Sequence, residues 1–217
     1  MLKRFYQNHQ KQIDRFDGLL VNNTVLERGL VIAPVVVMAN TVTNSLILGL
    51  SFILITFFGV LLASFVPKVL PYAIRVILYV LLAALLYIPV AWLMQFLFSE
   101  AVFQVGIFLP LLITNSLIVT KTETRFLKKK RLEMILDVFC HTLGFFLVIL
   151  VVGALREVLG SGTFLGESVG DGLYALTLPF GGFILLGFLA AALQRFRLYL
   201  HSADQTESEQ QKGGGES

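Results

Sequence analysis

Hydrophobic positions in this chain are gathered into six long blocks, separated by short polar segments. About 20 mainly apolar residues cross a bilayer as a helix, and each block is long enough to do so. The predicted spans run from about Leu19 to Ala39, Asn44 to Val66, Tyr72 to Phe98, Val102 to Thr120, Ile135 to Leu159 and Tyr174 to Phe196. Residues 19–198 are therefore expected to form one membrane domain of packed helices.

The two ends of the chain are polar. Residues 1–18 are charged and have no early apolar core, so we expect no secretory signal there. This cytoplasmic segment is either a short amphipathic surface helix or a solvated arm, and the pattern leaves both open. Residues 199–217 end in GGGES and are predicted to be a disordered cytoplasmic tail. The apolar side of the N-terminal helix would carry Leu2, Phe5, Tyr6, Ile13 and Phe16.

Composition excludes a soluble domain. Of the 217 residues 56% are hydrophobic and only 14% charged, and the mean hydropathy is +0.81. A soluble domain has about 25% charged residues. The single cysteine, Cys140, excludes both a disulfide within the chain and a cysteine-only metal site supplied by this chain alone. The net charge of +3 does not indicate nucleic-acid binding, because most basic residues flank the predicted spans.

The basic residues predict the orientation. With six spans, the N-terminus, the second and fourth loops and the C-terminus share one side of the membrane, and that side carries nearly all the lysines and arginines. The opposite side has Arg156. By the positive-inside rule, both termini lie in the cytoplasm. The run Lys128–Arg131 directly adjoins a span, so we interpret it as a topology anchor rather than a nucleic-acid or lipid-headgroup patch.

Polar and helix-breaking residues interrupt the first and fourth predicted spans. Interrupted segments at corresponding places in two halves of a chain are typical of broken helices at a repeat interface. Backbone groups freed at such breaks need protein or water partners, which Asn and Thr side chains can supply. These residues are Asn22, Asn23, Glu27, Arg28, Gly29 and Pro34 in the first span, and Gly106, Pro110, Thr114, Asn115 and Ser116 in the fourth.

The two interrupted spans also contain a near repeat. Leu19–Leu26 aligns with Leu111–Ile118, which places Asn23 on Asn115. Buried amides are costly in hydrocarbon, so a repeat that keeps them points to a buried site, although chance similarity of leucine-rich stretches is the alternative. Three spans per repeat is an odd number, so the second copy would be inverted. The predicted fold is an all-α integral membrane protein with six transmembrane helices in two inverted three-helix repeats and broken helices 1 and 4.

Four pieces of the sequence carry a family resemblance. They are Val21–Asn23 with Gly29-Leu30, Ala33-Pro34 and Thr43-Asn44; Gly106–Asn115; Asp137 at the start of the fifth span; and Leu155–Glu157 followed by Gly160–Phe164. Together they resemble the RnfE/NqrD subunits of Rnf complexes and of the Na⁺-translocating NADH:quinone reductase. The resemblance covers nearly the whole chain up to about Phe196. The fourth piece favours this branch over its sister, RnfA/NqrE.

The resemblance implies a subunit of an electron-transport complex in the bacterial cytoplasmic (inner) membrane. In the family, this subunit pairs with an inverted RnfA/NqrE-like sister, and each partner gives two cysteines to a shared [2Fe-2S] cluster. One family cysteine directly precedes the proline of the first broken helix, and the other directly follows the Thr-Asn of the second. These positions are Ala33 and Ser116 here. Iron–sulfur clusters need thiolates, so we expect no metal ligand and no cofactor from this chain alone.

Two acidic residues in the predicted membrane domain have a structural and a functional interpretation. Glu27 is a candidate ion or proton relay, because ionisable groups inside membranes are commonly functional. Alternatively it forms a neutral pair with Arg28 at a helix end. Asp137 is likewise a candidate relay, or else a helix cap or a partner of the Lys128–Arg131 block.

The remaining candidates are interpreted as structural. Arg156 and Glu157 are neighbouring opposite charges beside a Gly-Ser-Gly turn at the predicted outer surface. Cys140 and His141 have no ligand partner at metal-site spacing, so we take both as packing or weakly polar residues. The glycines of Gly160–Gly162 lack the Lys and Ser/Thr of a phosphate loop.

Two functional hypotheses follow. The leading one is a membrane subunit of an Rnf/Nqr-like complex with a divergent or vacant [2Fe-2S] site, which pairs with its sister, supports redox-coupled Na⁺ or H⁺ translocation and has no catalytic residue of its own. The alternative is an inverted-repeat transporter or channel-like protein that has lost redox chemistry. Its permeation site would be lined by Asn22, Asn23, Glu27, Thr114 and Asn115.

Overall fold

The computed structural model of the protein describes residues 36–67, 69–99, 101–114, 122–124, 131–192 and 194–195. Within these residues, three helices are long and apolar enough to cross a membrane. They are α4 (Val42–Ala63), α5 (Tyr72–Phe98) and Leu132–Ser161, which joins α9 (Arg131–Arg156) to a π-helical turn, η4 (Glu157–Ser161). These helices correspond to the second, third and fifth predicted spans, which are thereby confirmed.

Shorter elements connect or follow the long helices. They are α6 (Ala101–Val105), α7 (Phe108–Leu111), η1 (Leu112–Thr114), α8 (Thr122–Thr124), the strands β1 (Thr163–Phe164) and β2 (Glu167–Ser168), the 3-10 helix η5 (Tyr174–Thr177) and the apolar helix Pro179–Ala192. β1 and β2 pair antiparallel, with Thr163 opposite Ser168.

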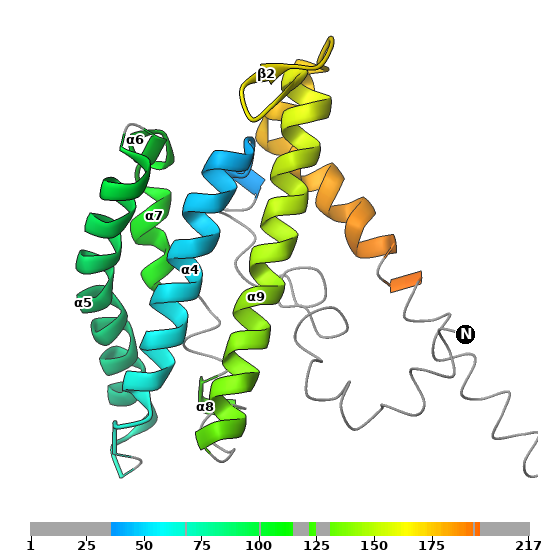
Figure 1. Ribbon diagram of the computed structural model, residues 1–217. Helices are drawn as coiled ribbons and strands as arrows, with labels where there is room; N and C mark the ends of the chain where they lie inside the picture. The colour runs from blue at the N-terminus through cyan, green and yellow to red at the C-terminus, as the bar shows by residue number, and fades with distance from the viewer. Residues whose placement is uncertain are drawn as a thin grey trace, which may run out of the picture.

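Helix α4 is the centre of the described bundle. It packs against α9 on one side and against α5 on the other, and α6 and α7 lie beside α5 (Figure 1). The beginning of α4 and the end of α9 lie at the same end of the bundle, close to the β1–β2 hairpin (Figure 1). The two helices therefore run antiparallel, as the alternating spans require.

Local sequence explains where α4 begins. Thr41 has an extended backbone (φ −131°, ψ 157°), and its side chain accepts a hydrogen bond from the Asn44 amide at 3.2 Å. This bond satisfies one of the amides that the first turn of a helix leaves without an intrahelical partner. The Ser45 hydroxyl donates to the Thr41 carbonyl at 2.8 Å. Thr41 therefore ends the preceding turn and starts the helix.

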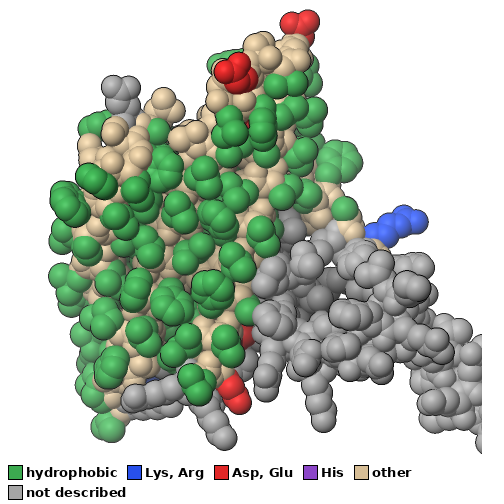
Figure 2. All heavy atoms as spheres, in the orientation of Figure 1, with side chains coloured by type: hydrophobic (Ala, Val, Ile, Leu, Met, Phe, Trp, Pro, Cys, Tyr) green, Lys and Arg blue, Asp and Glu red, His purple; other side chains and the backbone are tan. Residues whose placement is uncertain are grey.

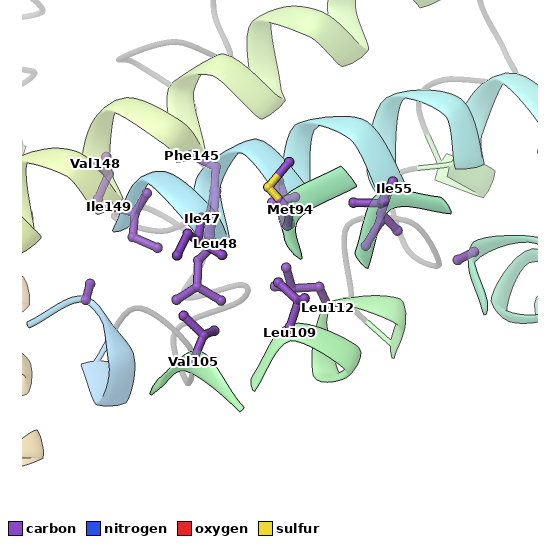
Figure 3. Close-up of a cluster of buried hydrophobic side chains, with 14 of the residues drawn as sticks. Ile47, Leu48, Ile55, Met94, Val105, Leu109, Leu112, Phe145, Val148 and Ile149 are labelled. Carbon is purple, nitrogen blue, oxygen red and sulfur yellow. The ribbon is translucent and has the colours of Figure 1, made fainter. Parts of the chain in front are cut away.

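The core lies around α4 and is built from aliphatic side chains of five elements. Ile47 and Leu48 of α4 lie near Met94 of α5 and near Val105 and Leu109 of the α6–α7 segment (Figure 3). On the other side of α4, the Phe52 and Phe145 rings stack with centroids 3.9 Å apart. The short pieces of the fourth predicted span are thus held against two continuous helices by apolar packing.

Glycines allow α4 and α9 to approach closely. A Cβ on Gly153 would lie 2.9 Å from the Ser45 Cβ and 3.0 Å from the Thr41 carbonyl oxygen. A Cβ on Gly49 would contact the Phe146 ring and lie 3.3 Å from the Ile149 side chain. Small residues at such crossings let backbones approach and gain dispersion contacts, which drive helix association in membranes.

We expect Gly153→Ala to destabilise the bundle by about 1–3 kcal/mol, because the added methyl overpacks the contact with Ser45. The matched control is Gly187→Ala in the helix Pro179–Ala192, where a Cβ meets nothing within 4 Å. This control should be neutral or slightly stabilising. Thermal unfolding in detergent, followed by size-exclusion chromatography, measures both variants. Equal midpoints for Gly153→Ala and the parent protein would contradict the close crossing.

The outward side of α5 is apolar along its length. Ile77, Leu81, Leu85, Ile88 and Trp92 recur every three or four residues and are 53–73% exposed. Hydrophobic side chains cover most of the visible face of the bundle (Figure 2). Exposed patches of this extent are unfavourable in water and are typical of surfaces that face lipid or another membrane protein. The structure therefore fits a multi-pass membrane protein.

Two predicted spans need correction. The sixth was predicted to begin at Tyr174, but Tyr174–Thr177 is a 3-10 turn, Leu178 is extended (ψ 156°) and the helix begins at Pro179. Proline disfavours helical geometry at the residue before it and suits the first helical position, which explains the late start. The described part of the fourth span is a series of short pieces, and residues 19–35 of the first span lie outside the described residues.

Candidate functional site

The fourth predicted span is interrupted at Gly106. This residue separates α6 from α7 and has φ +50°, a conformation that glycine adopts without a steric penalty. Pro110 is the third residue of α7, where the helix needs no i→i−4 amide. The 3-10 turn η1 then continues to Thr114, the last residue described in this segment. The predicted interruption is thus confirmed at Gly106, and its second half continues beyond the described residues.

Arg156 is the most deeply buried charged residue that the structure describes. Its side chain is 0% exposed, and all five of its N–H groups donate to backbone carbonyl oxygens. Nη1 donates to Val36 at 2.7 Å and to Ala39 at 3.1 Å, across more than a hundred residues of sequence. The other donors reach Leu176 from Nε at 3.0 Å, and Thr177 and Leu178 from Nη2 at 2.6 and 3.1 Å. One side chain therefore joins two chain segments to the end of α9.

The next residue, Glu157, acts on a third segment. Its carboxylate is almost completely buried, and Oε2 accepts a hydrogen bond from the Val42 amide at 2.6 Å. Val42 is the first residue of α4, so this bond satisfies an amide at the helix N-terminus. Oε1 accepts from the Gly166 amide in the hairpin turn at 3.3 Å. Glu157 thus ties the beginning of α4 to the β1–β2 hairpin.

The two charges match the polarity of the helix ends that they contact. Arg156 faces carbonyls at the ends of the helical turn 36–38 and of η5, where the helix dipole is negative. Glu157 faces the N-terminus of α4, where the dipole is positive. Charge-assisted hydrogen bonds of this kind are about twice as strong as neutral ones. Each charge is therefore stabilised by backbone groups of other segments.

Glycines make room for this junction. A Cβ on Gly182, in the last helix, would lie 2.7 Å from the Val36 carbonyl oxygen and 3.3 Å from Arg156 Nη1. Gly162 ends η4 with φ +66°, and its carbonyl accepts from the Val169 and Gly170 amides. The sequence interpretation of the Arg156-Glu157 pair as structural is consistent with these contacts. Its placement at the outer surface is wrong, because the surrounding segments bury both side chains.

Comparison with known proteins identifies the family. The family model described as "Rnf-Nqr subunit, membrane protein" matches residues 14–190. The chain is 33% identical over 192 residues to the RnfE protein of the ion-translocating oxidoreductase complex of Glaesserella parasuis serovar 5, covering 80% of this chain and 83% of that protein. The protein of the same name from Vibrio cholerae O395 is 33% identical over 193 residues (81% and 84%), and that from Aliivibrio fischeri MJ11 32% over 192 (81% and 85%). This chain belongs to the Rnf-Nqr subunit family. The resemblance seen in the sequence is thereby confirmed.

The family's cluster positions fall outside the described part of this Rnf-Nqr subunit. So do most of the predicted site residues, and only Pro110, Asp137 and the backbone of Thr114 are described. Whether the two asparagine stretches meet near mid-membrane therefore stays a prediction. The residues outside the described ranges are Asn22, Asn23, Glu27, Ala33, Pro34, Asn115 and Ser116.

Asp137 and His141 form a buried polar pair in α9. Their side chains are 3% and 0% exposed, and His141 Nδ1 lies 2.8 Å from the Asp137 carbonyl oxygen and 3.5 Å from its carboxylate oxygen. Asp137 lies in the second turn of a helix that begins at Arg131, so its predicted role as a helix cap is wrong. Cys140 is buried beside this pair as a free thiol. Among the described residues, no three His, Cys, Asp or Glu side chains are grouped to hold a metal ion.

A second ionic junction, missed in the sequence, lies at the opposite end of the bundle. Arg75 Nε and Nη2 each donate to one carboxylate oxygen of Glu123 at 3.0 Å, and the buried Tyr79 hydroxyl donates to the same carboxylate at 2.5 Å. Arg75 Nη1 also donates to the Leu70 carbonyl at 3.0 Å. The signal was present: Arg75 and Tyr79 are one helical turn apart, and Glu123 is an acidic residue in a basic loop.

We expect Glu123→Gln to destabilise the chain by about 1–3 kcal/mol, because the amide cannot accept both bonds from a partly buried guanidinium. Side-chain exposures of 16% and 18% indicate that added salt will screen this pair only weakly. The matched control is Glu133→Gln on the exposed side of α9, which should change stability by less than about 0.5 kcal/mol. Thermal unfolding of the two variants at low and high salt tests this, and equal midpoints would refute the junction.

Proposed function

We propose that this chain is the RnfE-type component of an Rnf/Nqr-like ion-translocating oxidoreductase complex. It has no catalytic activity alone. It pairs in the bacterial inner membrane with an inverted RnfA/NqrE-like sister and supports redox-coupled translocation of Na⁺ or H⁺. Its six spans form two inverted repeats, with both termini in the cytoplasm.

One observation carries this proposal: the similarity to RnfE proteins extends over about four-fifths of both chains. The family match, over residues 14–190, reaches into all six predicted spans. The apolar helices α4, α5 and α9 and the interruption at Gly106 agree with the membrane protein that the resemblance implies. The fourth predicted span, which carries half of the proposed repeat interface, is packed against α4 and α5 as short pieces.

The donor atoms of this chain do not fit the family's [2Fe-2S] cluster. The ligand positions hold Ala33, which has no donor atom, and Ser116, whose hydroxyl is a hard oxygen. The only thiol, Cys140, is buried in α9 beside His141, away from either ligand position in sequence. We therefore assign this chain no half-site for the cluster and route no electron-transfer step through it.

The buried polar residues remain the candidates for ion movement. Asp137 is nearly inaccessible within a helix long enough to cross the membrane, and the nearby His141 supports a relay role at this level. Glu27 is the corresponding candidate in the first span. Asn22, Asn23, Pro34, Pro110, Thr114 and Asn115 form the proposed broken-helix site between the two repeats.

The test is purification of the complex from native membranes through a tag on this chain. We expect the tagged chain to bring down an RnfA/NqrE-like sister and further Rnf/Nqr-like subunits, and the complex to oxidise NADH or reduced ferredoxin with ion uptake in proteoliposomes. Iron analysis and EPR spectroscopy after reduction should show no [2Fe-2S] cluster assigned to this pair of subunits.

Each outcome has a distinct meaning. A tagged chain that purifies without such partners, and that transports a solute in liposomes without redox activity, would establish the competing transporter or channel-like function. That function is favoured only by the missing thiolates at positions 33 and 116. A stoichiometric [2Fe-2S] signal assigned to this pair would overturn the vacant site while leaving membership in the complex intact.

A further inference from the structure

The two ionic junctions lie next to the two interrupted segments in sequence. Arg156 binds the carbonyls of Val36 and Ala39, which follow Pro34 of the first segment. The Arg75–Glu123 junction holds α8, which follows Ser116 of the fourth segment. Both arginines come from continuous, membrane-crossing helices, Arg75 from α5 and Arg156 from α9. Each interrupted segment is thus followed by a short piece of chain fixed to a rigid helix.

Interrupted helices depend on such contacts. A break removes several i→i−4 hydrogen bonds, so the two sides of the break are no longer kept in register by their own backbone. Position must then come from tertiary contacts with neighbouring elements. Fully satisfied, charge-assisted contacts are the strongest of these, because breaking them leaves buried polar groups without partners.

We propose that the Arg156-Glu157 junction and the Arg75–Glu123 junction are two independent positioning groups, each of which fixes one of the two interrupted segments. Their importance for ion translocation rests on the proposed function. Their positioning role rests on the contacts alone.

The geometry of the first junction opposes sliding of the reversal 36–42. Arg156 holds the carbonyls on one side of this reversal, and the adjacent residue Glu157 holds the Val42 amide on the other. Since both side chains arise from one helix end, the distance between their binding points is set by a single peptide unit. Movement of the reversal along its own axis would break bonds at both points.

The second junction fixes orientation as well as position. Arg75 and Glu123 meet with two parallel N–H···O bonds, and a planar guanidinium satisfies such a pair only when the two groups are coplanar. Tyr79 adds a third bond from the next turn of α5. In Figure 1, α8 lies at the opposite end of the bundle from the β1–β2 hairpin, so neither junction contacts the other.

This independence is tested with two cysteine reporters at positions that are fully buried. Ala39→Cys reports on the first junction, and Thr122→Cys, beside Glu123, reports on the second. Both wild-type side chains are 0% exposed. Each reporter is placed in a Cys140→Ser background, and maleimide labelling rates are measured in native membranes that contain the complex. The rates follow the fraction of molecules in which the local segment is open.

We expect a crossed pattern. Arg156→Gln should raise labelling of the Ala39→Cys reporter about tenfold or more and leave the Thr122→Cys reporter within about twofold. Glu123→Gln should do the reverse. Labelling of both reporters by either substitution, or of neither, would overturn the proposal, because the first indicates general loosening and the second indicates no positioning role. If Arg156→Gln does not accumulate, Arg156→Lys, with three donors in place of five, runs the same test with an intermediate expected rate.

A functional measurement completes the test. The ratio of ions taken up to electrons transferred is compared in proteoliposomes for the parent complex and the conservative Arg156→Lys variant. A purely structural defect lowers both rates together as active complex is lost, whereas displacement of an interrupted segment lowers the ratio. An unchanged ratio, together with a crossed labelling pattern, would overturn the functional part of the proposal. A parent complex without redox activity would instead refute the proposed function, and the labelling result would stand.

Discussion

Arg156→Leu is expected to prevent accumulation of this Rnf-Nqr subunit in the membrane. The substitution leaves five backbone carbonyls near the end of α9 without their donor, and these carbonyls belong to residues 20 to 120 positions away in sequence. Removing one partner of a buried charged network costs about 3–5 kcal/mol. Single domains have only about 5–15 kcal/mol of stability in total. The loss therefore leaves little or no net stability.

Replacement of a buried ion pair by apolar residues is often harmless, but that precedent does not apply here. It requires both partners to be replaced together. The partners of Arg156 are backbone carbonyls, which no substitution removes. The variant is measured by immunoblotting of membranes and by thermal unfolding of whatever protein is recovered. Arg195→Leu, at an exposed position of the last helix, is the matched control and should accumulate normally. A stable Arg156→Leu protein would show that the five bonds contribute little.

Exchange of the two charges separates this interpretation from a simple ion pair. If Arg156 and Glu157 stabilised each other, the double variant Arg156→Glu with Glu157→Arg would restore much of the stability lost in either single variant. We expect no such restoration. Each charge faces a helix end of fixed polarity, and the exchange would place a carboxylate against carbonyls and a guanidinium against amides. Recovery in the double variant would contradict the match to the helix ends.

The combined substitution Ala33→Cys with Ser116→Cys is expected to create a half-site for a [2Fe-2S] cluster. The two positions are those at which the family carries its cysteines, and thiolate is the donor that the cluster requires. With a sister that keeps its own two cysteines, the complex should gain about two iron atoms per pair of subunits and a new EPR signal after reduction. This change from no cluster to one cluster is the largest spectroscopic effect that we predict.

The single substitutions are the controls for this experiment. Ala33→Cys alone and Ser116→Cys alone each supply one thiolate, which is too few to complete a four-thiolate site with the sister. Both should therefore leave the iron content near that of the parent complex. A double variant without added iron, in a complex whose sister retains both cysteines, would show that the framework around positions 33 and 116 has diverged together with the ligands.

The sequence alone was sufficient for the class of protein and for its continuous helices. Long apolar blocks predicted α4, α5 and α9 because a membrane span needs only length and hydrophobicity, both of which are local properties. Gly106 marked the interruption of the fourth span for a similarly local reason, since a positive φ favours glycine. The start of the last helix was predicted wrongly because hydrophobicity outweighed Pro179, although that residue alone signals a helix start.

Only the tertiary structure showed what holds these elements together. Arg156 and Glu157 are neighbours in sequence and were interpreted as a surface pair, yet their partners are main-chain groups of Val36, Val42 and Thr177. Backbone carbonyls and amides are the same in every residue, so a sequence carries no mark of which of them a distant side chain will bind. Charge and spacing in the sequence therefore determined that this chain spans a membrane as an Rnf-Nqr subunit, whereas long-range packing decided which charges fix its interrupted segments.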